Sequence, residues 1–254
     1  METGERRRRN LPAVRAVATH VQVEIWSDVV CPWCYVGKRR FEQALERFAH
    51  ADDVTVTYRS FELDPGAPRE RTGTHDEHLA RKYGMTVERA HQLNDQMTQT
   101  AAADGLDFHF ERIRGGNTFD AHRLLHLALE RGKQQELKER LLLATFTEGE
   151  PVADRDALVR LASDVGIDAA EAREVLSSGR YADAVRADEQ QAMTYQITGV
   201  PFFVVDGKYG VSGAQPADVL LQVLERAHEE SRPLTIVNPG SGEAPYCDDG
   251  SCAV

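Results

Sequence analysis

The chain has 254 residues, with 30 basic and 41 acidic side chains and a formal charge of −11. This negative charge disfavours nucleic acid and anionic membranes as main partners. No apolar run reaches about 18 residues, so no membrane-spanning helix is expected. The first twenty residues carry a run of arginines over 6–9 and no apolar signal segment. We therefore expect a disordered arm over residues 1–20 and a cytoplasmic protein.

The first predicted elements are a strand, a helix and a second strand. The apolar stretch 21–26 predicts a strand. From Phe41 onward, large apolar residues recur at i, i+4 and i+7, which marks the buried face of a helix that begins near Cys34. Residues 54–58 are rich in β-branched and aromatic side chains and predict a second strand. Residues 21–65 are thus expected to form a βαβ unit.

A long helical region follows. The helices are predicted over 86–103, 118–131, 134–146, 154–165, 168–177 and 181–195. Either Asn117 or Thr118 is the predicted N-cap of the second of these helices. The short stretch 106–110 alternates like a strand, but we expect an extended loop there.

Strand character returns towards the end of the chain. Residues 200–205 and 208–212 flank Asp206-Gly207, a hairpin turn signal, and a last helix is predicted over 216–230. This order predicts an α/β fold that is split by a large all-helical insertion. The expected domains are a split α/β domain over 21–68 and 196–232, a helical insertion over 69–195, and a flexible tail over 233–254.

A Cys31-Pro32-Trp33-Cys34 motif lies where the first strand passes into the first helix. Backbone N–H groups at a helix N-terminus favour negative charge, so we expect Cys31 to ionise below the pKa of a free thiol and to act as the nucleophile. Pro32 suits the first helical position because the N–H that it lacks would have no partner there. Cys34, one turn away, would resolve a mixed disulfide.

A second cysteine pair, Cys247 and Cys252, lies in the tail, separated by four residues of which two are aspartates. The pair is predicted to form a secondary redox site that exchanges electrons with Cys31 and Cys34 through a Gly- and Pro-containing linker. An incidental pair and a metal-binding tail are the alternatives. Together the four cysteines could also form a zinc site, although a strand and a Pro-Trp pair before a helix are unusual around zinc.

The sequence resembles the thioredoxin-fold proteins of the DsbA family, and among them the FrnE-like branch, from about residue 21 to residue 230. Four segments carry this resemblance: Ser27-Asp28 before the motif, then Phe61–Pro65, Asn117–Arg123 and Gly199–Phe203. The resemblance implies a thioredoxin-like fold and thiol:disulfide oxidoreductase activity. It also implies a cis-proline at Pro201 that faces Cys31, and an insertion that lies over the cleft as a lid.

The expected contacts to substrate come from Trp33, Pro32 and the backbone of Val200. The expected partners are protein or small-molecule disulfides and thiols, together with a thiol reductant as electron donor, and no cofactor and no resident metal are expected. His122 and His126 lie one helical turn apart without the Glu of an H-E-x-x-H motif, so helix packing is favoured over metal ligation.

Two other functions remain open at this point. One is a thiol-dependent isomerase or transferase resembling 2-hydroxychromene-2-carboxylate isomerase and kappa-class glutathione transferases, in which the position of Cys31 usually holds serine. The other is a zinc-binding protein without catalysis.

Overall fold

A four-stranded mixed sheet lies at the centre of the structure, a computed structural model that describes residues 20–69 and 71–231. The strand order is β2-β1-β3-β4. β1 (Val21–Ser27) and β2 (Val54–Ser60) are parallel, with Val21 opposite Val54. β3 (Phe202–Val205) is antiparallel to both β1 and β4 (Tyr209–Ser212). The predicted βαβ unit and the C-terminal hairpin are therefore confirmed.

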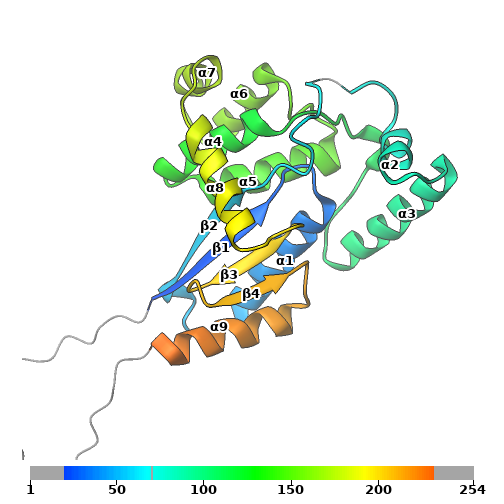
Figure 1. Cartoon of the computed structure of the whole chain (residues 1–254). Coiled ribbons are helices and arrows are strands. Elements are labelled where there is room, and N and C mark those ends of the chain that lie inside the picture. Colours follow the sequence, from blue (N-terminus) through cyan, green and yellow to red (C-terminus); the bar gives the residue numbers. More distant parts are fainter. Residues whose placement is uncertain (1–19, 70, 232–254) are drawn as a thin grey trace, which may run out of the picture.

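Two helices pack against the apolar side chains of the sheet. α1 (Pro32–Arg47) and α9 (Ala217–Ser231) contact each other beside the sheet, as Figure 1 shows. The ring of Phe41 on α1 stacks on that of Phe203 on β3, with ring centres 5.7 Å apart. The apolar residues that recur from Phe41 therefore face the core, and they pack α1 against the sheet.

Between β2 and β3 the chain is almost entirely helical (Figure 1). The helices are α2 (His75–Tyr83), α3 (Val87–Ala103), α4 (Phe119–Glu130), α5 (Gln134–Leu143), α6 (Arg155–Asp164), α7 (Ala169–Ser177) and α8 (Ala182–Thr194). Short helical turns occur in this region at η2 (Phe110–Arg112) and η3 (Ala144–Glu148), and a third, η1 (Ala51–Asp53), precedes β2. The predicted order of strands and helices is confirmed except for α2, which was not predicted, and the predicted domain boundaries remain predictions.

α2 is the helix absent from the predicted ranges. It has nine residues, and Ala80 is its only buried position. A surface helix this short shows little apolar periodicity. Its N-terminus is instead specified by a capping box: the Thr74 hydroxyl accepts from the Glu77 amide, and the Glu77 carboxylate accepts from the Thr74 amide.

The insertion helices are anchored to the exposed edge of the sheet at β2. The side-chain amide of Gln134 accepts a hydrogen bond from the Tyr58 N–H (2.8 Å) and donates one to the Tyr58 carbonyl (2.9 Å). The Trp26 indole on β1 donates to the Asp188 carbonyl on α8 (2.9 Å). The Gln134 contacts satisfy backbone groups that the edge strand β2 would otherwise expose, and the Trp26 contact fixes α8 relative to β1.

Among the described helices, none combines the length and apolar character that crossing a bilayer requires. Apart from His20, the predicted arm lies outside the described residues, and so does the predicted tail with Cys247 and Cys252.

Candidate active site

The Cys-Pro-Trp-Cys motif lies where the end of β1 meets the start of α1. Cys31 is the N-cap of α1, with extended backbone angles (φ −96°, ψ 113°), and Pro32 is the first residue of the helix. The Cys34 amide donates a hydrogen bond to the Cys31 carbonyl (3.0 Å). The predicted strand-to-helix junction is confirmed, and it places both cysteines at the N-terminal turn of α1.

Cys31 and Cys34 lie near each other, and both are free thiols in this structure. Both are almost completely buried, with exposed fractions of 4% and 2%. The Cys31 thiol donates to the carbonyl oxygen of Val200, with 3.5 Å between sulfur and oxygen. The Val200–Pro201 peptide bond is cis, as the family resemblance implied. Segments far apart in the sequence therefore meet at the sulfur of Cys31.

The side chains of Cys31 and Cys34 interact through a hydrogen bond, which shifts their two pKa values in opposite directions. This hydrogen bond, burial and the nearby charges of Cys34 and Asp28 raise the pKa of Cys31, although the Cys34 amide acts in the opposite direction. Burial also opposes ionisation of Cys34, but the hydrogen bond from Cys31 and the charge of Lys138 outweigh it and lower the pKa of Cys34. The pKa of Cys31 is therefore raised, contrary to the lowered pKa expected from the helix amides alone, whereas the pKa of Cys34 is lowered.

Lys138 on α5 is a residue of the site that the sequence analysis missed. Its side chain is fully buried, and its Nζ atom has no hydrogen-bond acceptor among the described residues. The nitrogen lies 5.6 Å from the centre of the Tyr58 ring. Burial lowers the pKa of Lys138, while the negative charges of Cys34 and Asp28 oppose this shift. A lysine among the leucines of an apolar helix face was the available sequence signal.

Asp28 is a buried carboxylate that lines the site. It is completely buried and accepts hydrogen bonds from the amides of Val29 (2.7 Å) and Leu63 (2.8 Å), while its Oδ1 lies 3.3 Å from Nε2 of His122. Burial opposes its ionisation, but the contacts with His122, the Leu63 amide and the charge of Lys138 outweigh burial and lower the pKa of Asp28. Sequence reasoning used Asp28 only as part of the family resemblance.

The two histidines of α4, His122 and His126, contact different carboxylates. His122 contacts Asp28, whereas His126 Nε2 lies 3.0 Å from Asp188 Oδ2 on α8. Both side chains pack against other elements, in agreement with the prediction of helix packing. Asn117 precedes α4, and its Oδ1 atom accepts from the Phe119 amide (3.0 Å), while Thr118 is the N-cap residue without a side-chain capping bond.

A cavity of about 650 Å³ opens beside Cys31. Pro32, Trp33 and Val200 line it, as expected for substrate-contacting residues, and Trp33 is 46% exposed. Cys34 is not among the lining residues, so Cys31 is the thiol that faces the cavity. The opposite wall comes from the helix pair α2 and α3, through residues such as His78, Leu79, Tyr83, Asn94 and Met97.

This arrangement suits thiol–disulfide exchange better than metal binding. A single thiol faces a partly apolar cavity, and a second thiol lies behind it with a positive charge nearby. Among the described residues, the group of His, Cys, Asp and Glu side chains that could hold an ion is His50, Asp53 and His228, and no cysteine belongs to it. The zinc alternative would need Cys247 and Cys252, which lie outside the described residues.

The similarities to other proteins cover most of the chain. The family model described as DSBA-like thioredoxin domain matches residues 22–225. The protein YwbO of Bacillus subtilis (strain 168) is 29% identical over 201 residues, which are 78% of this chain and 93% of YwbO. The crystal structure of a probable DsbA oxidoreductase from Streptomyces coelicolor is 48% identical, with 92% of this chain and 99% of that chain covered and a TM-score of 0.80.

Two more distant structures are similar in fold alone. The cytosolic disulfide reductase DsbM from Pseudomonas aeruginosa, solved with GSH, is 16% identical with a TM-score of 0.58, and 81% of this chain and 98% of that chain are covered. A 2-hydroxychromene-2-carboxylate isomerase is 16% identical with a TM-score of 0.60, and the covered shares are 82% and 97%.

Proposed function

The chain belongs to the DSBA-like thioredoxin domain family, and from this premise we propose that it is a cytoplasmic thiol:disulfide oxidoreductase of the FrnE-like branch. One observation carries the proposal: Cys31 alone of the two thiols lines the cavity, while Cys34 lies behind it. In a reducing compartment the reaction runs towards disulfide reduction or isomerisation.

The reaction begins with a proton transfer between the two sulfurs. The pKa of Cys31 is raised and that of Cys34 is lowered, so the attacking thiolate at Cys31 forms when the proton of Cys31 passes to the sulfur of Cys34. Cys31 attacks one sulfur of the substrate disulfide and forms a mixed disulfide, and the first substrate thiol leaves.

Resolution uses the second thiol. Cys34 loses its proton, attacks the sulfur of Cys31 and forms the Cys31–Cys34 disulfide, while the second substrate thiol leaves. The substrate has then gained two electrons, and the protein has lost two. An external thiol reductant returns the pair to its dithiol form. No cofactor takes part, and Lys138 stabilises the charge on Cys34.

The substrate lies along the cavity wall formed by Trp33 and Val200. The Val200 carbonyl, which accepts from the Cys31 thiol in the free protein, marks where a backbone N–H of an extended substrate would bind once Cys31 has reacted. Pro201 aligns this segment, and the helical insertion narrows the choice of substrate through α2 and α3.

We further propose that Cys247 and Cys252 exchange with this dithiol. These residues lie outside the described part of the chain, so the proposal depends on their sequence alone. If both are replaced by serine, reductant-driven turnover and the reduction potential of the active-site pair should change. If both the turnover rate and the reduction potential of the active-site pair are unchanged, this part of the proposal is contradicted.

Two cysteine variants test the oxidoreductase proposal. Cys34→Ser should accumulate a mixed disulfide with substrate because no thiol resolves it, and Cys31→Ser should form none. Reduction of insulin should be lost in Cys31→Ser. Survival of insulin reduction in Cys31→Ser would contradict the proposal. Glutathione-conjugating or isomerising activity that survives in Cys31→Ser would favour the isomerase alternative, and one stoichiometric zinc in the reduced protein would favour the zinc-binding alternative.

A further inference from the structure

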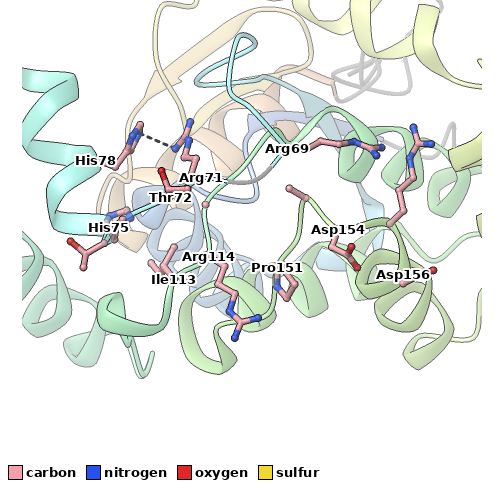
Figure 2. Close-up of a pocket in the computed structure, with 15 residues that line it drawn as sticks. Arg69, Arg71, Thr72, His75, His78, Ile113, Arg114, Pro151, Asp154 and Asp156 are labelled. Atoms are coloured by element: carbon pink, nitrogen blue, oxygen red, sulfur yellow. Dashed lines mark hydrogen bonds between the residues drawn. The ribbon is translucent and has the colours of Figure 1, made fainter.

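A second cavity, rich in arginine, adjoins the cavity at Cys31. Its volume is about 480 Å³, and its lining includes Arg69, Arg71, Arg114 and Arg155. Figure 2 shows these side chains coming from separate segments, with Arg69 and Arg71 on one side and Arg114 beside Pro151 on the other. Two aspartates, Asp154 and Asp156, also line the cavity, so its lining carries more positive than negative side chains in a protein whose formal charge is −11.

The two cavities are adjacent and share part of their lining. Arg71, His75, His78, Ile113 and Gly115 line both of them. A ligand with its sulfur at Cys31 can therefore extend past these residues into the arginine-rich cavity. No other described feature of the oxidoreductase site explains why guanidinium groups gather there.

Several guanidinium donors around this cavity have no acceptor in the part of the chain that the structure describes. Arg69 and Arg155 both donate to the Asp120 carboxylate, at 2.9 Å and 2.8 Å, and the buried Arg123 donates to the same group. One carboxylate thus faces three guanidinium groups, which leaves a surplus of positive charge. Within the described residues, Arg114 has no ion-pair partner at all.

The remaining lining cancels only part of this surplus, because its carboxylates are those of Asp154 and Asp156 against four arginines. Asp154 is committed to capping α6, since its carboxylate accepts from the Ala157 amide (2.8 Å). Arg71 is paired with Asp64 at the boundary between the cavities and donates towards His78. Burial lowers the pKa of His75 to about 4, so the positive charge comes from arginine and persists across the physiological pH range.

We propose that this cavity binds carboxylate side chains of a peptide whose disulfide is presented to Cys31, so that the protein prefers acidic peptide disulfides. The inference extends the oxidoreductase function proposed above. Arg114 and Arg155 supply the free donors for the carboxylates, and Arg71 lies where the ligand passes from one cavity to the other. Guanidinium groups recognise carboxylates through paired N–H donors, which ammonium groups cannot reproduce.

Single-turnover kinetics test the preference. The pre-reduced protein is mixed with short peptides whose only cysteine is linked to thiopyridine, and whose neighbouring pair of residues is Asp-Asp, Asn-Asn or Lys-Lys. Attack by Cys31 releases the pyridine thione, and closure of the Cys31–Cys34 disulfide releases the peptide thiol, so no external reductant is needed. We expect the acidic peptide to react about tenfold faster than the neutral one in low salt, because its two carboxylates form partly exposed ion pairs with the arginines. High salt should reduce this ratio.

Arginine variants separate the cavity from general charge effects. Arg114→Gln and Arg155→Gln should bring the acidic-to-neutral rate ratio close to one and leave the rate with the neutral peptide unchanged. Arg173→Gln is the matched control, since Arg173 is exposed on α7 and lines neither cavity, and it should keep the ratio. Equal rates with all three peptides in the wild type, or equal slowing of the acidic and neutral peptides in the variants, would overturn the inference. Failure to release thione from any peptide would instead reject the oxidoreductase function itself.

Discussion

Gly37 on α1 and the ring of Pro201 are in contact so close that no side chain fits between them. A Cβ atom at Gly37 would lie 2.8 Å from Cγ of Pro201 and 3.5 Å from Cβ of Ala214. The absence of a side chain at Gly37 therefore allows the Val200–Pro201 segment to approach α1, and this approach brings the Val200 carbonyl to the Cys31 thiol.

The first prediction concerns Gly37→Ala. Alanine has the higher helix propensity and would stabilise an exposed helix position by up to about 1 kcal/mol, but overpacking against a rigid ring costs about 1–3 kcal/mol. We expect a net loss of about 1–2 kcal/mol in the free energy of unfolding by urea, and slower disulfide reduction because Val200 is displaced from Cys31. Gly179→Ala is the control, because nothing lies within 4 Å of its added Cβ, and it should be neutral or stabilising. A Gly37→Ala protein that is more stable than the wild type would contradict the prediction, because it would show that the Pro201 ring moves away from the added methyl group at little cost.

The second prediction concerns Lys138→Met. The charge of Lys138 lowers the pKa of Cys34, so its removal should raise the pH at which the dithiol first ionises, measured by thiolate absorbance. A less stable thiolate also favours the disulfide form, so the reduction potential should become more negative. The unfolding free energy should stay the same or rise by about 1–3 kcal/mol, since the buried Nζ atom loses no hydrogen bond. Lys133→Met, at an exposed lysine just before α5, should change neither titration nor potential.

The third prediction concerns Asp28→Asn and pH. The pKa of Asp28 is lower in the folded state than in the unfolded chain, so its stabilising contribution is complete above about pH 4 and is lost as pH falls through the folded-state pKa. We expect the variant to be about 3 kcal/mol less stable at pH 7, because an amide cannot accept from both the Val29 and the Leu63 N–H groups. Its stability should also fall less steeply below pH 4.

The same variant tests the coupling of Asp28 to the thiols. The charge of Asp28 contributes to the raised pKa of Cys31, so Asp28→Asn should lower this pKa, opposite in sign to the effect of Lys138→Met on Cys34. Alkylation of the reduced protein across a pH series measures both shifts. Asp52→Asn, at an exposed carboxylate of η1, serves as the control. Parallel shifts in the two active-site variants would contradict the electrostatic account.

The parts of the fold that sequence predicted are those specified by local pattern. The apolar periodicity from Phe41, the β-branched run of β2 and the Asp206-Gly207 turn each determine an element from neighbouring residues alone. The position of Cys31 at the start of α1 was predictable for the same reason. The short helix α2 was not, because its start depends on two capping hydrogen bonds more than on apolar spacing.

The electrostatics of the site depend on tertiary contacts that no local pattern specifies. Lys138 reaches Cys34 from α5, and Asp28 is held at the base of the site by His122 and the Leu63 amide. The expectation of an acidic Cys31 considered the helix amides alone and omitted these groups. The arginine-rich cavity likewise combines segments near 69–71, 113–115 and 151–156, which are unremarkable when each is taken separately.

The fourth prediction concerns Arg123 on α4, whose side chain forms hydrogen bonds with the C-terminal end of α7. Its buried guanidinium donates to the carbonyls of Val175, Ser178 (2.5 Å) and Arg180 (2.9 Å), and to Asp120 (2.8 Å). Carbonyls at a helix C-terminus have no intrahelical donor, so Arg123 supplies donors to the Ser178 and Arg180 carbonyls and adds to the bond that the Ser178 hydroxyl donates to the Val175 carbonyl (3.3 Å).

Arg123→Met should therefore cost about 3–5 kcal/mol of unfolding free energy, because it leaves buried carbonyls without a donor. Arg123→Lys should recover only part of this loss, since an ammonium group cannot reproduce the planar set of donors. Arg173→Met, at an exposed position of α7, should be close to neutral. Because Arg123 and α7 line neither cavity, the rate of disulfide reduction per folded molecule should stay the same in all three variants. A slower rate in fully folded Arg123→Lys would show that the end of α7 influences the thiol site, contrary to this account.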